Sequence, residues 1–395
     1  MSFTRRDFTI GVASSAATLC SGFAGELLVG AANAAVVPAV KKTRILFNEN
    51  PLGPSPLSLS AIESNVSMLS RYPLAEGPRL EMKLRKMYGL SYHEATGELA
   101  LTPAPTLEGN TDLLLGVGSS EILRSIAWAY GTQEGNMVEA NPSYSAVGDA
   151  TGAMPGARLE RRIVPLNEAG RVSASEMIKA IDAETKLVVV CNPNNPTGTS
   201  IPLSEIESIA DAMPKESLLL VDEAYIEFLP NAEKVSAIEL AKNRDNVLVV
   251  RTFSKIYGMA GLRVGYGVGA ISVIQKIKPY MLGRLSMSMA GVLAAEAGLD
   301  DVKHIARTRE LYQKTNEMWE RCFHDAGWKM TPSDVGFCWV DVGHDAAPLV
   351  SFLAESGVLI CSGMRWNLPN HVRISMGTES ENDQLLRGVG AYKLA

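Results

Sequence analysis

The sequence predicts an α/β fold with a mostly parallel sheet, because apolar strand-like runs alternate with helical runs through the middle of the chain. The strand-like runs are 113–117, 136–140, 187–191, 218–222, 247–251 and 264–268, with helical patterns at 120–130, 173–182 and 203–213. The runs 187–191 and 218–222 are apolar throughout, which is typical of central strands that helices cover on both faces. We therefore expect βαβ units that build one large domain.

After about residue 280 the pattern changes and predicts a smaller α+β domain. A helical stretch at 288–326 precedes short strands at 335–342, 357–361 and 371–375 and a final helix. Residues 41–57 are irregular, and residues 76–92, at the start of the large domain, have a helical pattern. We divide the chain into a signal peptide (1–34), an N-terminal arm that is part of the small domain (35–75), a large domain (76–280) and a small C-terminal domain (281–395).

The first 34 residues have the pattern of an export signal. Arg5 and Arg6 precede a weakly apolar stretch rich in Ala, Ser and Gly, which ends in the small-x-small cleavage pattern of residues 32–34. A twin arginine is typical of the bacterial Tat route, so we predict a periplasmic protein that is exported folded. Serines and Glu26 interrupt the apolar stretch, so we expect no membrane anchor. The alternative is an ordinary amphipathic N-terminal helix.

Composition excludes several other classes of protein. The 395 residues carry 37 Lys and Arg against 43 Asp and Glu, a net charge of −6, and no basic stripe occurs. A nucleic-acid partner is therefore not expected. The five cysteines form no C-x-x-C pair and have no metal-like spacing with the five histidines, so no metal site is expected. The sequence leaves the disulfide state open.

Polar residues follow the predicted strands, and the carboxyl ends of strands are where open α/β sheets bind ligands. After the run 113–117, Gly118, Ser119 and Ser120 open a helix whose backbone N–H groups can hold a phosphate. A dinucleotide-binding loop would have a third glycine at position 121, where this chain has Glu121. This loop alone is therefore a weak signal.

Three further side chains lie at the ends of the central strands. Asn195 belongs to a Pro- and Gly-containing loop after the run 187–191, which can also be read as a simple turn. Asp222 ends the run 218–222, and Tyr225 follows three residues later. A buried carboxylate at this place needs a cation, unless it serves as the N-cap of a helix.

A lysine follows the strand at 247–251. Thr252, Ser254 and Lys255 come directly after it, and Arg263 follows beyond a small apolar segment. A lone lysine is usually a solvated surface residue, but in apolar surroundings its pKa falls and it can act as a nucleophilic amine. In combination, these groups match pyridoxal phosphate (PLP), which has a phosphate, a ring nitrogen, a phenol and an aldehyde.

These motifs and their order resemble the fold-type I PLP enzymes, and within them the class I/II aminotransferases, in particular the histidinol-phosphate aminotransferases. The likeness runs from about residue 47 to residue 378. Its landmarks are Asn-Glu-Asn-Pro (48–51), Arg-Tyr-Pro (71–73), Asn-Pro-Ser-Tyr (141–144), Asn-Asn-Pro-Thr-Gly (194–198), Asp-Glu-Ala-Tyr (222–225), Thr-Phe-Ser-Lys (252–255), Gly-Leu-Arg-Val-Gly (261–265) and Val-Arg-Ile-Ser (372–375).

The resemblance implies a PLP-transferase fold, PLP as cofactor and a role for each matched residue. Lys255 would form the internal aldimine and act as the base, and Asp222 would pair with the pyridinium nitrogen. Tyr225 and Asn195 would donate to the phenolate oxygen, and Tyr144 would stack on the ring. The groups implied to hold the phosphate are Ser119, Ser120, Thr252, Ser254 and Arg263, with Tyr72 reaching the phosphate of the neighbouring subunit in a homodimer.

The substrate side of the resemblance is less complete. Arg373 resembles the arginine that binds the anionic end of the substrate, and Arg365 is either a second anion-binding residue or a solvated one. Asn50 belongs to the Asn-Glu-Asn-Pro motif. Histidinol-phosphate aminotransferases usually have a phosphate-binding tyrosine after this motif, whereas this chain has Leu52, which cannot donate a hydrogen bond. We therefore expect a different amino acid, with an apolar or aromatic side chain favoured.

The main hypothesis is a ping-pong transfer of an amino group from an α-amino acid to a 2-oxo acid. Histidinol-phosphate aminotransfer is one alternative, and a PLP-dependent decarboxylase or oxidase on the same scaffold is another, because the same residues would serve all of these reactions. A non-catalytic periplasmic binding protein is a hypothesis from a different class.

Overall fold

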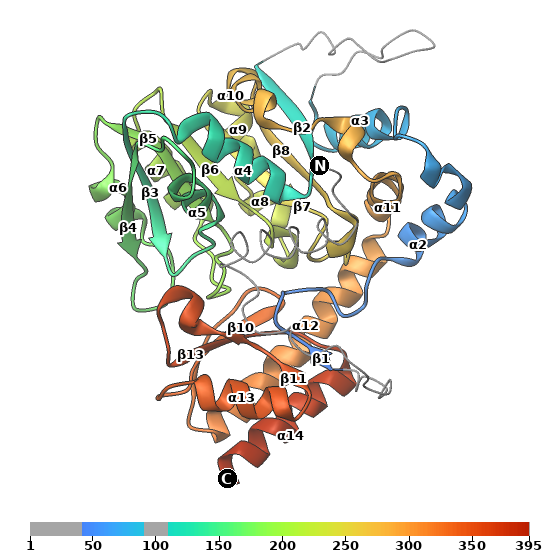
Figure 1. Ribbon diagram of the computed structural model, residues 1–395, viewed down its shortest axis with the longest axis vertical. Helices are drawn as coiled ribbons and strands as arrows, with labels where there is room; N and C mark the ends of the chain where they lie inside the picture. The colour runs from blue at the N-terminus through green and yellow to red at the C-terminus, as the bar shows by residue number, and fades with distance from the viewer. Residues whose placement is uncertain (1–41, 91–109, 395) are drawn as a thin grey trace, which may run out of the picture. The chain divides into compact units, whose positions relative to one another are not determined.

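A seven-stranded sheet forms the centre of the larger part of the molecule (Figure 1). The computed structural model describes residues 42–90 and 110–394, so the predicted signal peptide lies outside the described residues. The strand order is β2 (Thr111–Val117), β8 (Val264–Ala270), β7 (Val247–Thr252), β6 (Leu218–Asp222), β5 (Thr185–Cys191), β3 (Gly135–Asn141) and β4 (Leu159–Pro165). Only β8 runs antiparallel to its neighbours, which confirms the predicted mostly parallel sheet.

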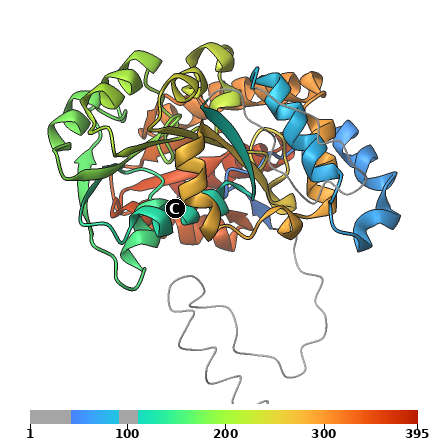
Figure 2. The same ribbon diagram turned by 90° about the horizontal axis from the view of Figure 1, so that it is seen from above.

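Helices cover both faces of this sheet (Figure 2). Leu218 and Leu220 of β6 pack on one side in a core that includes Ile122 of α4, whereas Leu219 and Val221 pack on the other side with Ile206 of α7. The first face is covered by α4 (Ser119–Tyr130), α5 (Ala146–Gly152) and α10 (Ile271–Ile277), and the second by α6 (Ala174–Ala180), α7 (Leu203–Ala212) and α9 (Ile238–Asn243). This double cover explains why the central strands are apolar throughout.

The C-terminal part contains a four-stranded antiparallel sheet. Its order is β12 (Cys361–Ser362), β13 (His371–Ser375), β10 (Phe337–Asp341) and β9 (Lys329–Thr331), and it is accompanied by α12 (Val302–Asp325), α13 (Ala347–Glu355) and α14 (Glu379–Leu394). Strand β1 (Thr43–Arg44) of the N-terminal arm pairs in parallel with β11 (Val358–Leu359). The arm is thereby attached to the C-terminal part.

The remaining elements are short or lie along one edge of the molecule. They are α2 (Pro56–Glu63), α3 (Glu76–Met87), α8 (Ala232–Val235), α11 (Met289–Gly298) and the 3₁₀ helices η1 (Val66–Ser70), η2 (Ile226–Phe228), η3 (Ala260–Leu262), η4 (Lys278–Tyr280), η5 (Arg284–Ser286) and η6 (Gly363–Trp366). The described residues include no helix that is both long and apolar enough to span a membrane. Lys42–Ala395 forms one compact unit. The domain boundary that we place at residue 280 therefore stays a prediction.

Three elements differ from the sequence prediction. The helix expected at 76–92 ends at Met87, because Gly89 takes a left-handed backbone conformation with φ of 63°. The stretch 288–326 is two helices, and Asp301 starts the second by accepting a hydrogen bond from the backbone N–H of His304. Strand β4 was not predicted, because this edge strand carries exposed charged residues such as Glu160, which obscure the alternation of apolar and polar residues.

Candidate active site

A pocket of about 270 Å³ lies where the parallel strands of the large sheet end. The ends of β2, β3, β5, β6 and β7 share one edge because these strands run in the same direction, and β8 begins there because it runs the opposite way. The predicted site residues that line the pocket are Ser119, Ser120, Tyr144, Asn195, Asp222, Tyr225, Thr252, Ser254, Lys255, Arg263, Arg365 and Arg373. Sheet topology therefore brings together residues that are far apart in the sequence.

One end of the pocket is suited to an anion. Helix α4 begins at Ser119 after Gly118, so the free backbone N–H groups of its first turn open toward the pocket. The Nη1 atom of Arg263 donates to Ser254 Oγ at 3.3 Å and to the Ala260 carbonyl at 2.8 Å. Gly118 has φ of 71°, and a Cβ atom at this position would collide with the guanidinium of Arg263. The glycine therefore lets the arginine lie against the start of the helix.

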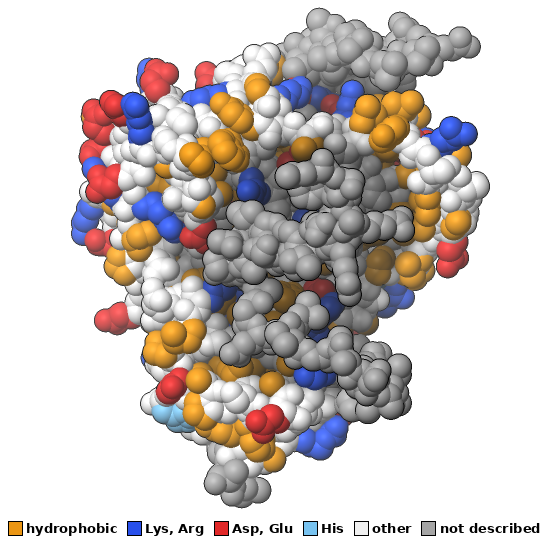
Figure 3. Space-filling model, viewed as in Figure 1, with side chains coloured by type: hydrophobic (Ala, Val, Ile, Leu, Met, Phe, Trp, Pro, Cys, Tyr) orange, Lys and Arg blue, Asp and Glu red, His pale blue; other side chains and the backbone are white. Residues whose placement is uncertain are grey.

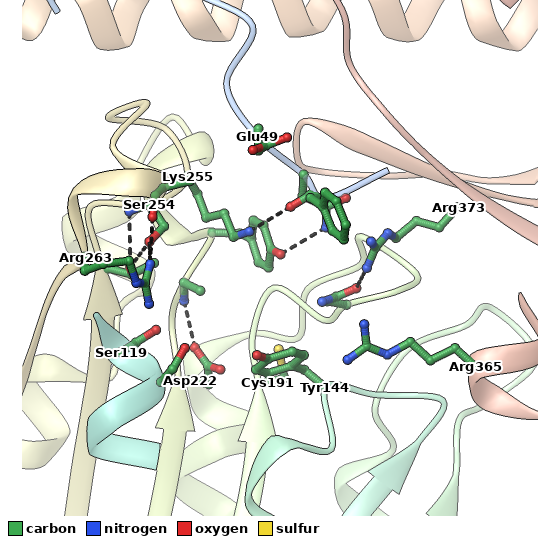
Figure 4. Close-up of a pocket in the computed structure, with 18 residues that line it drawn as sticks. Glu49, Ser119, Tyr144, Cys191, Asp222, Ser254, Lys255, Arg263, Arg365 and Arg373 are labelled. Atoms are coloured by element: carbon green, nitrogen blue, oxygen red, sulfur yellow. Dashed lines mark hydrogen bonds between the residues drawn. The ribbon is translucent and has the colours of Figure 1, made fainter. Parts of the chain in front are cut away.

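Lys255 is in the middle of the pocket (Figure 4). Its Nζ donates to the backbone carbonyl of Phe47 at 3.0 Å and lies 5.6 Å from the centre of the Tyr225 ring. Burial, followed by the positive charge of Arg373, lowers the pKa of Lys255 to about 8. A much larger share of this amine is neutral near pH 7 than for a solvated lysine, so it is able to act as a nucleophile and as a base.

Asp222 and Tyr225 lie next to the lysine at the end of β6. The carboxylate of Asp222 accepts from the backbone N–H of Ala224 at 3.1 Å, and its burial raises its pKa to about 6. The Tyr225 hydroxyl accepts from Asn48 Nδ2 at 3.0 Å, and burial raises the pKa of this phenol. Because the phenol keeps its proton, it is able to donate a hydrogen bond into the pocket.

Two arginines reach the pocket from the C-terminal part. Arg373 of β13 is 4% exposed, and it donates to Asn195 Oδ1 at 2.6 Å and to the carbonyl of Leu46 at 2.5 Å. Its Nε atom is buried without a hydrogen-bond partner among the described residues. Arg365 of η6 is exposed, and its guanidinium points toward Tyr144 and the pocket (Figure 4).

Three predicted site residues do not line this pocket. Tyr72 is 69% exposed, and Leu52 is 43% exposed. The Asn50 side chain is buried and its amide donates to the Ile256 carbonyl at 2.7 Å and to Thr308 Oγ1 at 3.0 Å. Asn50 therefore fixes the arm against the segment after Lys255, and its amide is not available to a substrate.

The pocket also contains residues to which sequence reasoning gave no role. Asn48, which orients Tyr225, and Glu49 both belong to the Asn-Glu-Asn-Pro motif, and Cys191 ends β5. Asn48 has φ of 55°, a conformation that asparagine tolerates better than most residues. Its place in the Asn-Glu-Asn-Pro motif was the available signal.

The comparisons with known proteins agree with this geometry. A family model described as aminotransferase class I and II matches residues 78–389. The chain belongs to this family. This aminotransferase is 34% identical over 353 residues to histidinol-phosphate aminotransferase 2 of Pseudomonas fluorescens, a match that covers 88% of this chain and 87% of that protein. It is 32% identical over 351 residues to a histidinol-phosphate aminotransferase of Geobacillus thermodenitrificans, with 88% of each chain covered.

A solved structure of a related protein has the same fold. The histidinol-phosphate aminotransferase from Sinorhizobium meliloti, in complex with pyridoxal-5'-phosphate, superposes with a TM-score of 0.76 at 27% identity and covers 89% of this aminotransferase and 91% of that chain. The predicted fold, the aminotransferase class and the PLP cofactor are therefore confirmed.

The residues of this aminotransferase fit PLP. Asp222 is a buried carboxylate whose raised pKa reflects an environment with too little compensating positive charge, which a protonated ring nitrogen would supply. The first turn of α4 together with Arg263 fits a phosphate, and the amine of Lys255 fits an aldehyde. The pocket thus contains a helix start suited to a phosphate, an amine suited to an aldehyde and a buried carboxylate suited to a ring nitrogen.

Proposed function

We propose that this aminotransferase moves the amino group of an α-amino acid to a 2-oxo acid in two half-reactions that share one site. The observation that carries the proposal is the Lys255 amine, held near Asp222 in a pocket that lowers its pKa to about 8. When bound, PLP withdraws electrons from the amino-bearing carbon of the substrate, which makes its Cα proton removable. The residues around it supply position and proton transfer.

In this proposal, several groups hold the cofactor. The backbone N–H groups of Ser119 and Ser120 and the side chains of Thr252, Ser254 and Arg263 would hold the phosphate, since they converge at the start of α4. Tyr144 would lie against the ring, and the amide of Asn195 would donate to the phenolic oxygen together with Tyr225.

The reacting groups would work as an acid–base set. Asp222 would keep a proton on the ring nitrogen, because a carboxylate in this buried place stabilises a neighbouring cation. The amine of Lys255 would take the proton from the substrate Cα and return it to the cofactor, as a base whose pKa lies near the working pH. Arg373 would bind the α-carboxylate and so orient the Cα–H bond.

Histidinol-phosphate aminotransfer remains a second candidate, because the relatives at 34% and 32% identity carry that name. Decarboxylation or oxidation would use the same lysine and aspartate, so these reactions are distinguished from amino transfer by their products. We would incubate the PLP-loaded protein with histidinol phosphate and a panel of amino acids, adding 2-oxoglutarate as acceptor. A new 2-oxo acid matched by a new amino acid supports amino transfer, whereas release of CO₂ or peroxide without a new amino acid contradicts it. Binding without any product would indicate a non-catalytic binding protein.

The active form in this proposal is a homodimer in which Tyr72 reaches the phosphate of the other subunit. Hydrophobic side chains are exposed along the edge of the molecule formed by α2, η1 and the segment that leads to α3 (Figure 3), which supports an interface there. They include Leu57, Leu59, Val66, Met68, Leu69, Tyr72 and Leu74. Light scattering should give the mass of two chains. Tyr72→Phe should weaken PLP binding about tenfold or more, with Tyr392→Phe as the control. A monomer with full PLP affinity would contradict the proposal.

The location in this proposal is the periplasm, reached in folded form through the Tat route. The support is the twin arginine at Arg5 and Arg6 together with a cofactor that must be bound inside a folded protein. Replacing both arginines with lysine should leave the full-length protein in the cytoplasmic fraction, whereas the unchanged chain is shortened after about residue 34 and exported. Finding the unchanged chain in the cytoplasm at full length would rule this out.

A further inference from the structure

A cysteine of the small sheet lies beside the arginine that we propose to bind the substrate. Cys361 of β12 is directly opposite Arg373 of β13 in the antiparallel register of these strands. Opposite residues of an antiparallel pair point to the same face of the sheet, with Cβ atoms about 4.5–5.5 Å apart. The Cys361 side chain is half-buried, and its Sγ lies 3.7 Å from the carbonyl oxygen of Ser362, which is a weak contact. The thiol is therefore next to Arg373 and within reach of a small solute.

One nitrogen of Arg373 is left without an acceptor. The outer nitrogens donate to Asn195 and to the carbonyl of Leu46, whereas Nε is buried and has no hydrogen-bond partner within residues 42–90 and 110–394. Nε is the guanidinium nitrogen nearest to the main chain, so a side chain on the paired strand is well placed to reach it. A buried N–H without a partner is costly, and a thiol sulfur is only a weak acceptor. An oxygen bound to the sulfur would remove this cost.

The environment of Cys361 differs from that of the other described cysteines. Cys191 and Cys338 are buried, and burial raises the pKa of both thiols, so they stay protonated and react slowly. Burial lowers the pKa of Arg373, and the largest influence that opposes this is a negative charge on Cys361. A partly exposed thiol beside a cation is the environment of a reactive cysteine. Cys322 of α12 is half-buried as well, which makes it the natural comparison.

From this arrangement we infer that Cys361 is a site of oxidation by hydroperoxides, and that its oxidised sulfur pairs with Arg373 and so weakens substrate binding. In the first step the thiolate sulfur attacks one oxygen of hydrogen peroxide, which forms an S–O bond and breaks the O–O bond. The other oxygen leaves as hydroxide and takes up the proton that the thiol released. The sulfur loses two electrons, the peroxide gains them, and the products are a sulfenic acid and water.

The oxidised sulfur changes what Arg373 is able to bind. The sulfenic acid places an oxygen within reach of Nε, and a second oxidation gives a sulfinate, which pairs with the guanidinium as an anion. An arginine whose charge is already compensated binds a substrate carboxylate more weakly. This consequence rests on the role of Arg373 in the proposed amino transfer. Thiols reduce a sulfenic acid, so the first stage of the effect is reversible.

The first test identifies the oxidised residue without any amino transfer. The PLP-loaded protein is treated with hydrogen peroxide in the presence of dimedone, which traps sulfenic acids, and the peptides are analysed by mass spectrometry. The adduct should form at Cys361 and not at the buried Cys191 or Cys338. Cys361→Ser should lose this adduct, whereas Cys322→Ser, the matched control at a second half-buried thiol, should keep it. No adduct, or an adduct only at another cysteine, overturns the inference.

The second test asks whether the modification acts on substrate binding. After catalase has removed the remaining peroxide, KM for the best amino donor of the panel should be about tenfold higher and kcat should change much less. Dithiothreitol should reverse the effect after a short exposure, and Cys361→Ser should resist it. Cys361→Asp carries a carboxylate where the sulfinate would be, so its KM should be raised without peroxide. Cys361→Asn has the same shape without the charge and should keep the original KM.

Two results would overturn the link to Arg373. One is oxidation of Cys361 that leaves KM unchanged, and the other is an equal loss of activity in Cys361→Ser. If no donor is converted, the proposed amino transfer fails and the trapping result at Cys361 still stands by itself. Calorimetry with pentanoate, which has one carboxylate and no amino group, then replaces KM. Tighter binding to the PLP-loaded Cys361→Asn variant than to Cys361→Asp supports the link, and equal binding overturns it.

Discussion

The two sheets contribute to the pocket through different kinds of structure. The seven-stranded sheet supplies Asp222 and Lys255 from the ends of buried strands, and these positions are covered by helices on both faces. The four-stranded sheet supplies Arg373 from a strand, but Arg365 comes from η6, which spans only Gly363–Trp366. The side proposed to hold the cofactor is therefore fixed by the core, and the side proposed to meet the substrate depends on a few local contacts.

This difference separates the expected effects of substitutions. Changes on the large-sheet side should affect cofactor binding and the chemical step for every substrate. Changes on the small-sheet side should alter how substrates are ranked and leave the cofactor in place. Lys255 connects the two sides, because the charge of Arg373 contributes to its lowered pKa.

The largest effect is expected at Lys255. Lys255→Ala removes the amine that we propose as base and as the group that binds the cofactor, so kcat/KM should fall by at least about 10²- to 10⁴-fold for all donors. The visible absorbance of bound PLP should disappear as well. Lys179→Ala is the control, since Lys179 is an exposed lysine paired with Glu176. Retention of the absorbance in the Lys255 variant would place the reactive amine elsewhere.

The next effect concerns the glycine that lets Arg263 approach α4. Gly118→Ala places a methyl group against the guanidinium, so PLP affinity should fall about tenfold to hundredfold. Gly156→Ala is a matched control, because Gly156 has φ of 77° but open space around its would-be Cβ. The strain of the positive φ is then common to both variants. Equal PLP affinity in the two would show that the contact with Arg263 does not matter.

A smaller effect is expected in the pH dependence of PLP uptake by the cofactor-free protein. Uptake requires the neutral amine, so its rate should rise about tenfold from pH 7 to pH 9 and level off, because the pKa of Lys255 is about 8. An amine with an ordinary lysine pKa would rise about a hundredfold over this range and would not level off. Arg373→Gln removes a positive charge that lowers the pKa, so the plateau should move to higher pH. An unchanged pH profile in this variant would show that the charge of Arg373 does not influence the pKa of Lys255.

The sequence predicted which residues of the large sheet meet in the pocket better than it predicted the positions of the arm residues, and this contrast has a physical cause. Asp222 and Lys255 follow strongly apolar strands, so their place at one sheet edge follows from the pattern of the chain. Asn50 and Leu52 lie on an irregular arm, where the direction of each side chain depends on contacts with distant residues such as Thr308. Contacts between such distant residues leave no periodic pattern in the sequence. The orientation of Tyr225 by Asn48 was missed for the same reason.

The smallest effect concerns Trp366, which positions Arg365. Trp366→Phe keeps an aromatic ring against Trp339, whose ring centre lies 5.4 Å away, but removes the hydrogen bond to the Ser143 carbonyl. That bond contributes about 0.5–1.5 kcal/mol, so KM for the amino donor should rise about two- to tenfold. PLP affinity should not change.

Trp328→Phe serves as the control for the loss of an indole, because Trp328 stacks on Phe323 outside the pocket. An unchanged KM in the Trp366 variant would mean that the hydrogen bond to Ser143 is not needed to position Arg365. A fall in PLP affinity in the Trp366 variant would show that η6 also stabilises the part of the pocket proposed to bind the cofactor. The short elements of the small sheet would in that case be mechanically coupled to the core of the large one.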